Sequence, residues 1–259
     1  MGLRIDTTTN EVIVDHASRE HLHTTRRGNP VQETVGVMHV DSIFRRKKAS
    51  RKLQRNRQVR LLGDNCPLIY ALKQQQGLWV SRNSVKILNA HIPQLVADVC
   101  GPLNGHVTCI VPIVSRYPLA EILAKHISKN LGVPVFNGVF QKATFFQASR
   151  RAHALLANRP AMAAAGLSWQ DEKLLRNVMK EGMQQGGAPY SAKNVKTHLR
   201  QYFDPLRLAA GATMPATQDR VLFVDDLLAT GETLLAAAAL LQGQGIASVD
   251  RSVTWFSKV

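Results

Sequence analysis

An apolar stretch that runs into two adjacent carboxylates and a small-residue turn constrains this chain more than any other feature. Its sequence, residues 221–233, is VLFVDDLLATGET. The apolar start predicts a buried strand over residues 220–224, and the residues from 233 to 243 predict a helix. Because α/β sheets bind ligands where their strands end, we expect Asp225 and Asp226 at a ligand site. The alternative is a core strand whose acidic pair only caps the next helix.

The residue types in this segment suit a ribose phosphate. Ionised carboxylates such as Asp225 and Asp226 accept hydrogen bonds from the two neighbouring hydroxyls of a ribose. The turn that follows offers the hydroxyls of Thr230 and Thr233 together with N–H groups at a helix N-terminus. N–H groups placed in this way bind a phosphate monoester. The segment therefore predicts a ribose 5-phosphate site.

Other stretches predict a parallel sheet around this segment. Residues 106–114 form a continuous apolar run rich in β-branched residues, which is typical of a strand buried on both faces. Residues 119–130 are amphipathic and predict a helix that ends at Gly132, and residues 133–136 predict a short strand. A closing strand is predicted at residues 248–255. This alternation of strands and helices indicates an α/β fold with helices flanking a parallel sheet.

The remaining stretches are expected to surround that core. Strands are predicted at residues 11–15 and 35–40, and two helices over residues 65–100, the second capped by Ser81 and continuing past Pro93. Residues 140–218 predict several helices, which we expect to pack over the sheet edge. We therefore divide the chain into an N-terminal extension with a basic segment (1–64), a core (65–139 and 219–259) and a largely helical insertion (140–218).

Residues 221–233 resemble the motif that binds phosphoribosyl pyrophosphate (PRPP) in type I phosphoribosyltransferases. That motif has an apolar strand, two acids and a turn with Thr-Gly-x-Thr. Residues 68–77 (LIYALKQQQG), 119–125 (LAEILAK) and 131–134 (LGVP) are similar to the orphan competence-protein-F-like members of this superfamily. The resemblance covers residues 65–140 and 219–259. It implies a type I phosphoribosyltransferase-like parallel sheet and, for this chain, PRPP as a substrate.

The resemblance also implies roles for individual residues. Asp225 and Asp226 would contact the ribose hydroxyls, and the turn would wrap the 5-phosphate. Glu232 stands where a smaller or uncharged residue is common, so we expect its side chain to point to solvent. The loop after the first core strand would bind pyrophosphate, although Arg116 is open to a second interpretation as a surface residue. The implied PRPP-binding set is Ser115, Arg116, Val224, Asp225, Asp226, Leu227, Leu228, Ala229, Thr230, Gly231, Glu232 and Thr233.

An enzyme of this family would transfer the phosphoribosyl group to an acceptor with Mg²⁺ as cofactor. Asp225, Asp226 and Arg116 would be the catalytic residues, and the two aspartates would reach Mg²⁺ indirectly, through ribose or water. A flexible loop would begin within residues 141–151, where Lys142, Arg150 or Arg151 would reach pyrophosphate; a solvated basic helix is the alternative for each. No hood for a known acceptor base is recognisable, so the acceptor stays unidentified.

The charge of the chain supports a second hypothesis. The net charge is +15, and residues 45–60 contain nine Lys/Arg and no acid. This run is either a solvated face or a contact with nucleic acid. In the second hypothesis the fold is catalytically repurposed and binds or senses nucleic acid or a ribonucleoprotein, in a bacterial accessory or defence system. The candidate contacts are Arg45, Arg46, Lys47, Lys48, Arg51, Lys52, Arg55 and Arg57.

Several classes of protein are disfavoured. No apolar run approaches the roughly 20 residues of a membrane-spanning helix, and the N-terminus lacks the apolar centre of a signal peptide. The three cysteines, Cys66, Cys100 and Cys109, form no metal-binding spacing, which favours buried free thiols in a reducing compartment. His21 and His23 lack the further ligands of a metal site. We therefore expect a cytoplasmic protein without membrane contact, in which a homo-oligomer or a protein partner stays open.

Overall fold

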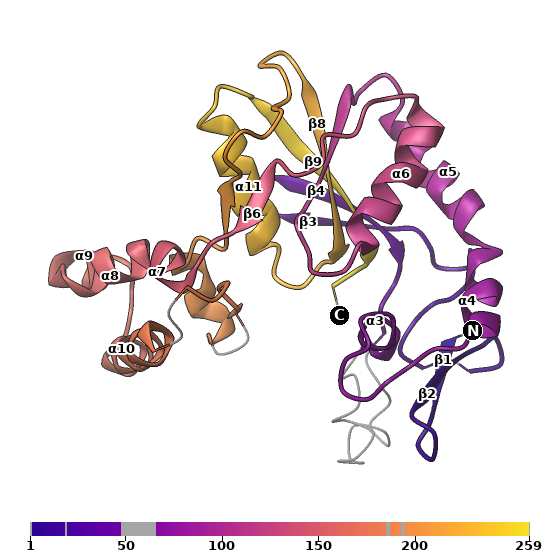
Figure 1. The fold of residues 1–259 in the computed structure, drawn as a ribbon, viewed down its shortest axis with the longest axis horizontal. Coiled ribbons are helices and arrows are strands. Elements are labelled where there is room, and N and C mark those ends of the chain that lie inside the picture. Colours follow the sequence, from indigo (N-terminus) through magenta and orange to yellow (C-terminus); the bar gives the residue numbers. More distant parts are fainter. Residues whose placement is uncertain (1, 19, 48–65, 185–186, 193–194, 259) are drawn as a thin grey trace.

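A five-stranded sheet forms the centre of the computed structural model, which describes residues 2–18, 20–47, 66–184, 187–192 and 195–258. The strand order is β3-β4-β9-β8-β5, and every neighbouring pair is parallel except β3 with β4 (Figure 1). The fold is therefore mixed α/β with a largely parallel sheet, as predicted. The strands are β3 (Val31–Val35), β4 (Met38–Phe44), β5 (Cys109–Pro112), β8 (Arg220–Leu227) and β9 (Ser248–Phe256).

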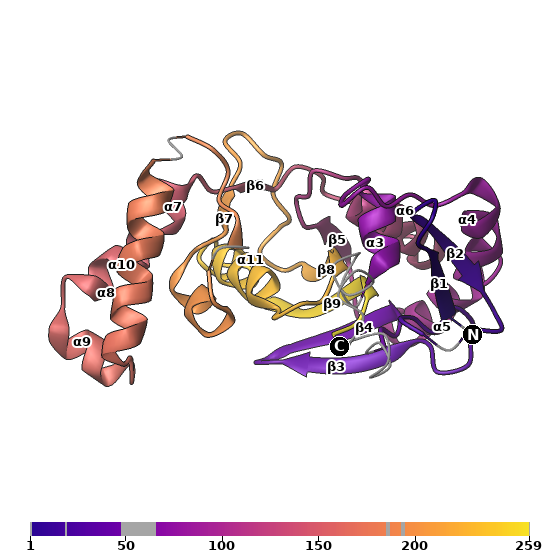
Figure 2. The same cartoon turned by 90° about the horizontal axis from the view of Figure 1, so that it is seen from below.

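Helices cover both faces of this sheet (Figure 2). Helices α5 (Ile92–Leu103) and α6 (Leu119–Leu131) pack on one face with Leu222 and Val224 of β8. Helix α11 (Glu232–Gln242) packs on the other face. Alternate β8 residues point to opposite faces, which is why the strand reads as a continuous apolar run.

The predicted strand–helix–strand unit is present, with a shorter second strand. β5 leads into α6, whose C-terminal cap is Gly132 with a φ of 70°. Beyond it, Val135 makes a single parallel bridge to Ile110 on the outer side of β5. The helix prediction is confirmed, and residues 133–136 shorten to that one bridge.

The N-terminal part differs from the prediction in one strand. The predicted strand at residues 35–40 is wrong, because the chain reverses at Gly36 and Val37 between β3 and β4. β4 then pairs with β9, so this hairpin completes the main sheet. The predicted strand at residues 11–15 is confirmed as β2 (Glu11–Asp15), which pairs with β1 (Gly2–Asp6) in a separate hairpin. The domain boundary at residue 64 stays a prediction.

The long helix predicted after Ser81 is two helices. Ser81 caps α4 (Arg82–Asn89) by accepting a hydrogen bond from the Ser84 N–H, at 3.3 Å. The chain turns at Ala90 and His91, and α5 begins with Pro93 in its first turn. A proline is tolerated there because the first N–H groups of a helix have no partner within it. A shorter helix, α3 (Pro67–Leu72), precedes them.

The predicted insertion forms a helical lobe on a two-stranded neck. The neck is the antiparallel pair β6 (Phe140–Lys142) and β7 (Leu206–Leu208). The lobe has an apolar core of its own and its helices project away from the sheet (Figures 1 and 2), so the expected packing over the sheet edge is wrong for these helices. Its elements are α7 (Phe145–Ala148), α8 (Arg150–Leu156), α9 (Arg159–Ala164), α10 (Trp169–Met183) and the 3₁₀ helix η2 (Thr197–Tyr202).

The prediction of buried free thiols is confirmed. Cys66, Cys100 and Cys109 are free and buried, and burial raises the pKa of each thiol, to about 11 for Cys66. The thiols therefore stay protonated and are poor nucleophiles. Within the part of the chain that the structure describes, no helix is long and apolar enough to cross a membrane.

Candidate functional site

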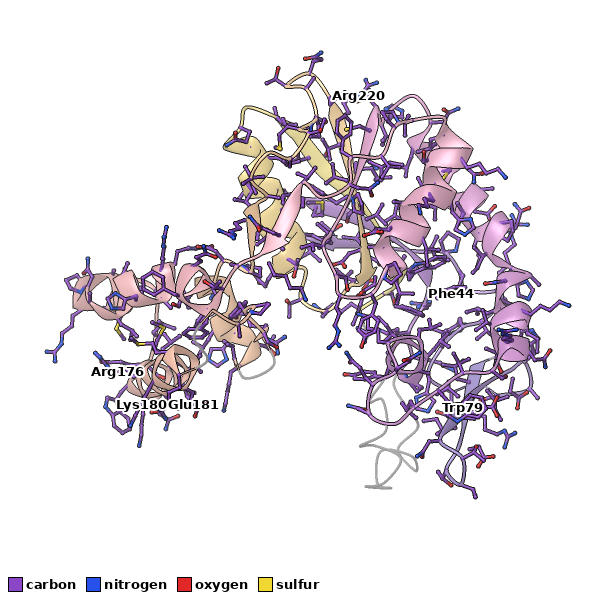
Figure 3. The ribbon with its side chains drawn as sticks, viewed as in Figure 1. Phe44, Trp79, Arg176, Lys180, Glu181 and Arg220 are labelled. Carbon is purple, nitrogen blue, oxygen red and sulfur yellow. The ribbon has the colours of Figure 1, made fainter. Side chains whose placement is uncertain are left out.

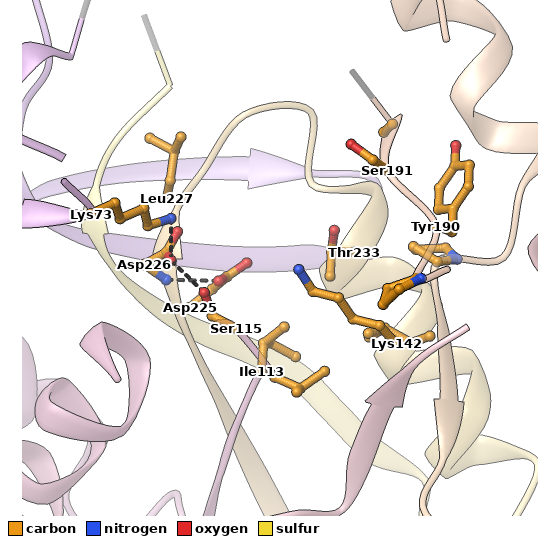
Figure 4. A pocket seen from close by; sticks show the side chains of 15 residues that line it. Lys73, Ile113, Ser115, Lys142, Tyr190, Ser191, Asp225, Asp226, Leu227 and Thr233 are labelled. Atoms are coloured by element: carbon orange, nitrogen blue, oxygen red, sulfur yellow. Dashed lines mark hydrogen bonds and ion pairs between the residues drawn. The ribbon is translucent and has the colours of Figure 1, made fainter. Parts of the chain in front are cut away.

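A polar cavity of about 390 Å³ opens at the carboxyl ends of β5 and β8 (Figure 4). The chain leaves β5 through α6 toward one side of the sheet, whereas β8 continues into α11 on the other face. Ligands of open α/β sheets bind where the connections diverge in this way. The lining residues come from the core, the neck and the lobe: Lys73, Ile113, Val114, Ser115, Lys142, Pro189, Tyr190, Ser191, Ala192, Pro205, Leu206, Asp225, Asp226, Leu227 and Thr233.

The two predicted carboxylates both line the cavity, in different surroundings. β8 runs to Leu227, so Asp225 and Asp226 lie inside the strand and their side chains point to opposite faces. Asp226 is buried, and its Oδ2 lies 2.5 Å from Nζ of Lys73 and accepts a hydrogen bond from Oγ of Ser115 at 3.2 Å. Asp225 accepts a hydrogen bond from the Asp226 N–H at 2.7 Å. Asp226 is thus held in place, and Asp225 is the acid with fewer protein partners.

The pKa of Asp225 is shifted by its surroundings. Burial raises the pKa of Asp225 to about 7, and the charge of Asp226 raises it as well. The hydrogen bond from the Asp226 N–H and the ammonium groups of Lys73 and Lys142 oppose this rise. Asp225 therefore exchanges its proton near neutral pH, which is a common property of residues in functional sites.

The turn that leads into α11 requires a glycine. Gly231 adopts a left-handed conformation with a φ of 79°, and a Cβ atom there would lie 2.4 Å from Cγ1 of Val35. The first N–H groups of α11 have no partner within the helix, and a helix N-terminus of this kind favours an anion. Thr233 lines the cavity beside them, whereas Glu232 is half-buried and lies outside the lining.

Arg46 anchors the start of the same turn. Its Nη2 donates to the carbonyl oxygen of Leu228 at 3.0 Å, and its Nε donates to the carbonyl oxygen of Ser257. Its backbone N–H donates to Oγ of Ser257 at 2.9 Å. A residue predicted to contact nucleic acid therefore ties the ends of β4 and β9 to the turn.

The other predicted nucleic-acid contacts are exposed or lie outside the described residues. Arg45 and Lys47 are exposed. The remaining five, whose positions the structure does not describe, are Lys48, Arg51, Lys52, Arg55 and Arg57.

The structure gathers part of the predicted PRPP-binding set. Ser115, Asp225, Asp226, Leu227 and Thr233 line the cavity. Six other members of the set do not line the cavity, although five of them form the turn between Leu227 and Thr233. These six are Val224, Leu228, Ala229, Thr230, Gly231 and Glu232.

The predicted cations of the pyrophosphate region divide into two groups. Lys142 lines the cavity from the neck. Arg116 is exposed, with its guanidinium carbon 5.8 Å from the centroid of the Tyr117 ring, and it does not line the cavity. Arg151 pairs with Asp204 at 3.3 Å, and Arg150 is exposed on the lobe.

Sequence reasoning missed Lys73, Tyr190 and Ser191. Lys73 caps the C-terminus of α3, and only the tertiary fold brings it to Asp226. Its one sequence signal is a lone cation closing an apolar helix. Tyr190 and Ser191 follow a glycine-rich loop of the insertion and carry no recognisable pattern.

Asp225 and Asp226 fit Mg²⁺ only if the ion is held mainly by the phosphates of a bound substrate. Among the described residues, no group of three or more His, Cys, Asp or Glu side chains is arranged to hold a metal. Mg²⁺ is commonly bound by one or two carboxylates together with substrate phosphates and water. Because Lys73 already neutralises Asp226, contact through ribose or water suits this pair better than direct coordination.

Comparison with known proteins adds little. No protein-family model and no curated protein matches the chain. One solved structure it can be aligned with is the adenine phosphoribosyltransferase of Trypanosoma brucei in complex with AMP, pyrophosphate and ribose-5-phosphate. The alignment covers 99% of this chain and 87% of that chain, with 12% sequence identity and a TM-score of 0.32. A likeness of this size does not assign a family, so the case for the site rests on its own residues.

Proposed function

We propose that this protein binds PRPP or a ribose 5-phosphate nucleotide in the cavity and transfers the phosphoribosyl group to an acceptor. One observation carries the proposal: carboxylates at the end of β8 and Thr233 in the first turn of α11 line a single cavity. The first suits the diol of a ribose and the second suits its 5-phosphate. The largely parallel sheet is compatible with a phosphoribosyltransferase fold.

Each part of the ligand has a place in this arrangement. The 5-phosphate would accept hydrogen bonds from the N–H groups at the start of α11 and from the Thr233 hydroxyl. The ribose hydroxyls would donate to Asp225 and to the free oxygen of Asp226, whose position Lys73 and Ser115 fix. Pyrophosphate would extend toward Lys142, with Arg116 as a second cation if its loop closes over the ligand.

Transfer would then be a displacement at C1 of the ribose. The acceptor forms a bond to C1 as the bond from C1 to the pyrophosphate oxygen breaks, and the acceptor loses one proton. Positive charge develops on the ribose and negative charge on pyrophosphate, so nearby carboxylates and ammonium groups stabilise the two ends of the reaction. Bound Mg²⁺ would supply further neutralisation of the pyrophosphate oxygens.

The acceptor would enter from the lobe. Pro189, Tyr190, Ser191 and Ala192 form that wall of the cavity and belong to the predicted insertion. Tyr190 is buried with its ring stacked on Phe203, so the exposed Ser191 is the polar side chain that this wall would offer to a small acceptor. The acceptor itself stays unidentified.

A ligand series tests the assignment of the two subsites. We would titrate the protein with ribose 5-phosphate, ribose and inorganic phosphate, and compare Asp225→Asn and Thr233→Val with Asp250→Asn, an exposed aspartate on β9. Ribose 5-phosphate should bind best, Asp225→Asn should weaken ligands that carry ribose, and Thr233→Val should weaken ligands that carry phosphate. Equal weakening of all three ligands by both variants would contradict the assignment.

A further inference from the structure

One face of α10 carries cations and large apolar side chains toward solvent. The helix begins after Ser168, whose hydroxyl oxygen accepts a hydrogen bond from the Asp171 N–H. Exposed residues then recur three or four positions apart, which places them on one side of an α-helix. The opposite side is buried in the lobe. We define the α10 stripe as Trp169, Lys173, Arg176, Lys180 and Met183.

The composition of this stripe is unusual for a face that meets only water. The side of a helix that faces solvent is ordinarily polar. Here Trp169 is 72% exposed and Met183 is 70% exposed, at the two ends of the helix. Nζ of Lys173 lies 5.5 Å from the centroid of the Trp169 ring, so one cation already contacts the aromatic face.

The lobe as a whole is positively charged, whereas α10 itself carries three cations and three acids, Asp171, Glu172 and Glu181. Residues 140–218 contain 11 Lys/Arg and 4 Asp/Glu. Two of the acids beside the stripe are engaged: Asp171 contacts His198 at 2.7 Å, and Glu172 pairs with Arg176 at 2.7 Å. Figure 3 shows Arg176 and Lys180, with Glu181 beside them, on the outer side of the lobe and away from the sheet. A polyanion can therefore reach the stripe without obstruction from the core.

We propose that the α10 stripe binds single-stranded nucleic acid. Its three cations are spaced about 4.5 and 6 Å apart along the helix axis, so one backbone can run past them. Trp169 supplies a surface on which an unpaired base stacks, and a groove that combines cations with an aromatic side chain is typical of single-strand binding without sequence preference. The phosphates of a duplex would contact the cations, but its paired bases could not stack on Trp169. The proposal does not depend on the phosphoribosyl site.

The salt dependence of binding tests the cationic part. The probe is fluorescein-labelled oligothymidine of about 16 nucleotides, followed by fluorescence anisotropy at several salt concentrations. Replacing Lys173, Arg176 and Lys180 by alanine should reduce the slope of log affinity against log salt by about 2, because each single-strand phosphate contact contributes about 0.7. The control replaces the exposed Arg82, Lys125 and Lys129, which changes the net charge equally at other helices. Equal slopes for the two triple variants would overturn the proposal.

The aromatic part is tested separately. Trp169→Ala should weaken oligothymidine at least about fivefold, and Trp169→Phe should retain most of the affinity, because stacking needs a ring and not an indole. A duplex of the same length should bind more weakly than the single strand and should not respond to Trp169→Ala. An unchanged affinity of Trp169→Ala, or equal binding of the duplex, would overturn the proposal. All positions are exposed, and thermal unfolding checks that each variant is folded.

Discussion

Two neighbouring aspartates acquire different properties from their contacts. Asp226 is buried against Lys73 and Ser115, which compensate its charge. Asp225 lines the same cavity from β8 with fewer protein partners, and burial raises its pKa to about 7. Asp226 is therefore suited to a fixed hydrogen-bond acceptor, and Asp225 to a group that responds to the ligand and to pH.

The raised pKa of Asp225 predicts how stability depends on pH. The carboxyl has a pKa of 3.8 in the unfolded reference and about 7 in the folded protein. Between these values the folded protein keeps a proton that the unfolded chain releases, so the free energy of unfolding should fall as pH rises and should level off above 7. Asp225→Asn should lose this component and be more stable than the wild type at about pH 8.

Urea denaturation of both proteins from about pH 5 to pH 8 measures this difference. The difference between Asp225→Asn and the wild type should grow with pH. A constant difference would show that Asp225 does not carry the pH dependence.

Local sequence was sufficient to predict that the two acids belong to the site, and insufficient to predict which residues contact them. Asp225 and Asp226 belong to one short motif, so their position next to Gly231 and Thr233 follows from chain order. Lys73 reaches Asp226 only through tertiary packing, across more than half of the chain. The extension of β8 to Leu227 depends on its pairing with β9, and this extension turns the two carboxylates to opposite faces.

At the scale of elements, the turn between β8 and α11 is held from two sides. Val35 of β3 packs against Gly231, and Arg46 at the end of β4 holds the carbonyl of Leu228. Both contacts come from the N-terminal hairpin, which the sequence analysis placed outside the core. Arg46 could not be distinguished from Arg45 there, because a run of basic residues has no period that marks which side chain turns inward.

Gly231→Ala should damage both stability and phosphate binding. A left-handed conformation costs alanine about 1–2 kcal/mol, and the contact with Val35 adds to it. We expect the free energy of unfolding to fall by about 2–3 kcal/mol and ribose 5-phosphate to bind poorly. Combination with Val35→Ala should restore part of the stability, because it removes the closest contact, with Cγ1, and not the backbone strain. Unchanged urea unfolding in Gly231→Ala would contradict the described turn.

Arg46→Ala should weaken ribose 5-phosphate more than ribose, because in the proposed complex the phosphate contacts the turn that Arg46 positions. Hydrogen bonds from a charged donor are each worth about 1.5–3 kcal/mol, and the Arg46 side chain donates two, so a loss of about 3 kcal/mol or more in unfolding free energy should accompany it. Arg45→Ala, an exposed neighbour, is the matched control. If the two variants bind both ligands alike, Arg46 does not position the turn.

At the scale of the whole molecule, a helical lobe is carried on an α/β core by a narrow neck. The lobe has its own apolar cluster, and the N–H of Ala143 donates to the carbonyl oxygen of Pro205 at 3.1 Å where the two neck strands enter it. Helix periodicity predicted the helical content of this region. Its placement away from the sheet could not be predicted, because the apolar residues that bury one another there look the same as residues that would cover a sheet.

Excising the lobe tests this organisation. Lys142 and Leu206 are opposite each other in the neck, so an Asn-Gly turn can join them and replace the residues between. The shortened protein should unfold cooperatively, retain ribose 5-phosphate binding and lose oligothymidine binding. Loss of cooperative unfolding would mean that the core depends on the lobe, and retained oligothymidine binding would place that site elsewhere.

We propose above all that the cavity at the ends of β5 and β8 binds a phosphoribosyl ligand. Calorimetric titration with PRPP and Mg²⁺, with Asp225→Asn/Asp226→Asn as the control, tests it most directly. We expect micromolar binding by the wild type and none by the folded double variant. A folded wild type that does not bind PRPP, or a double variant that binds it equally well, would show that this cavity is not a phosphoribosyl site.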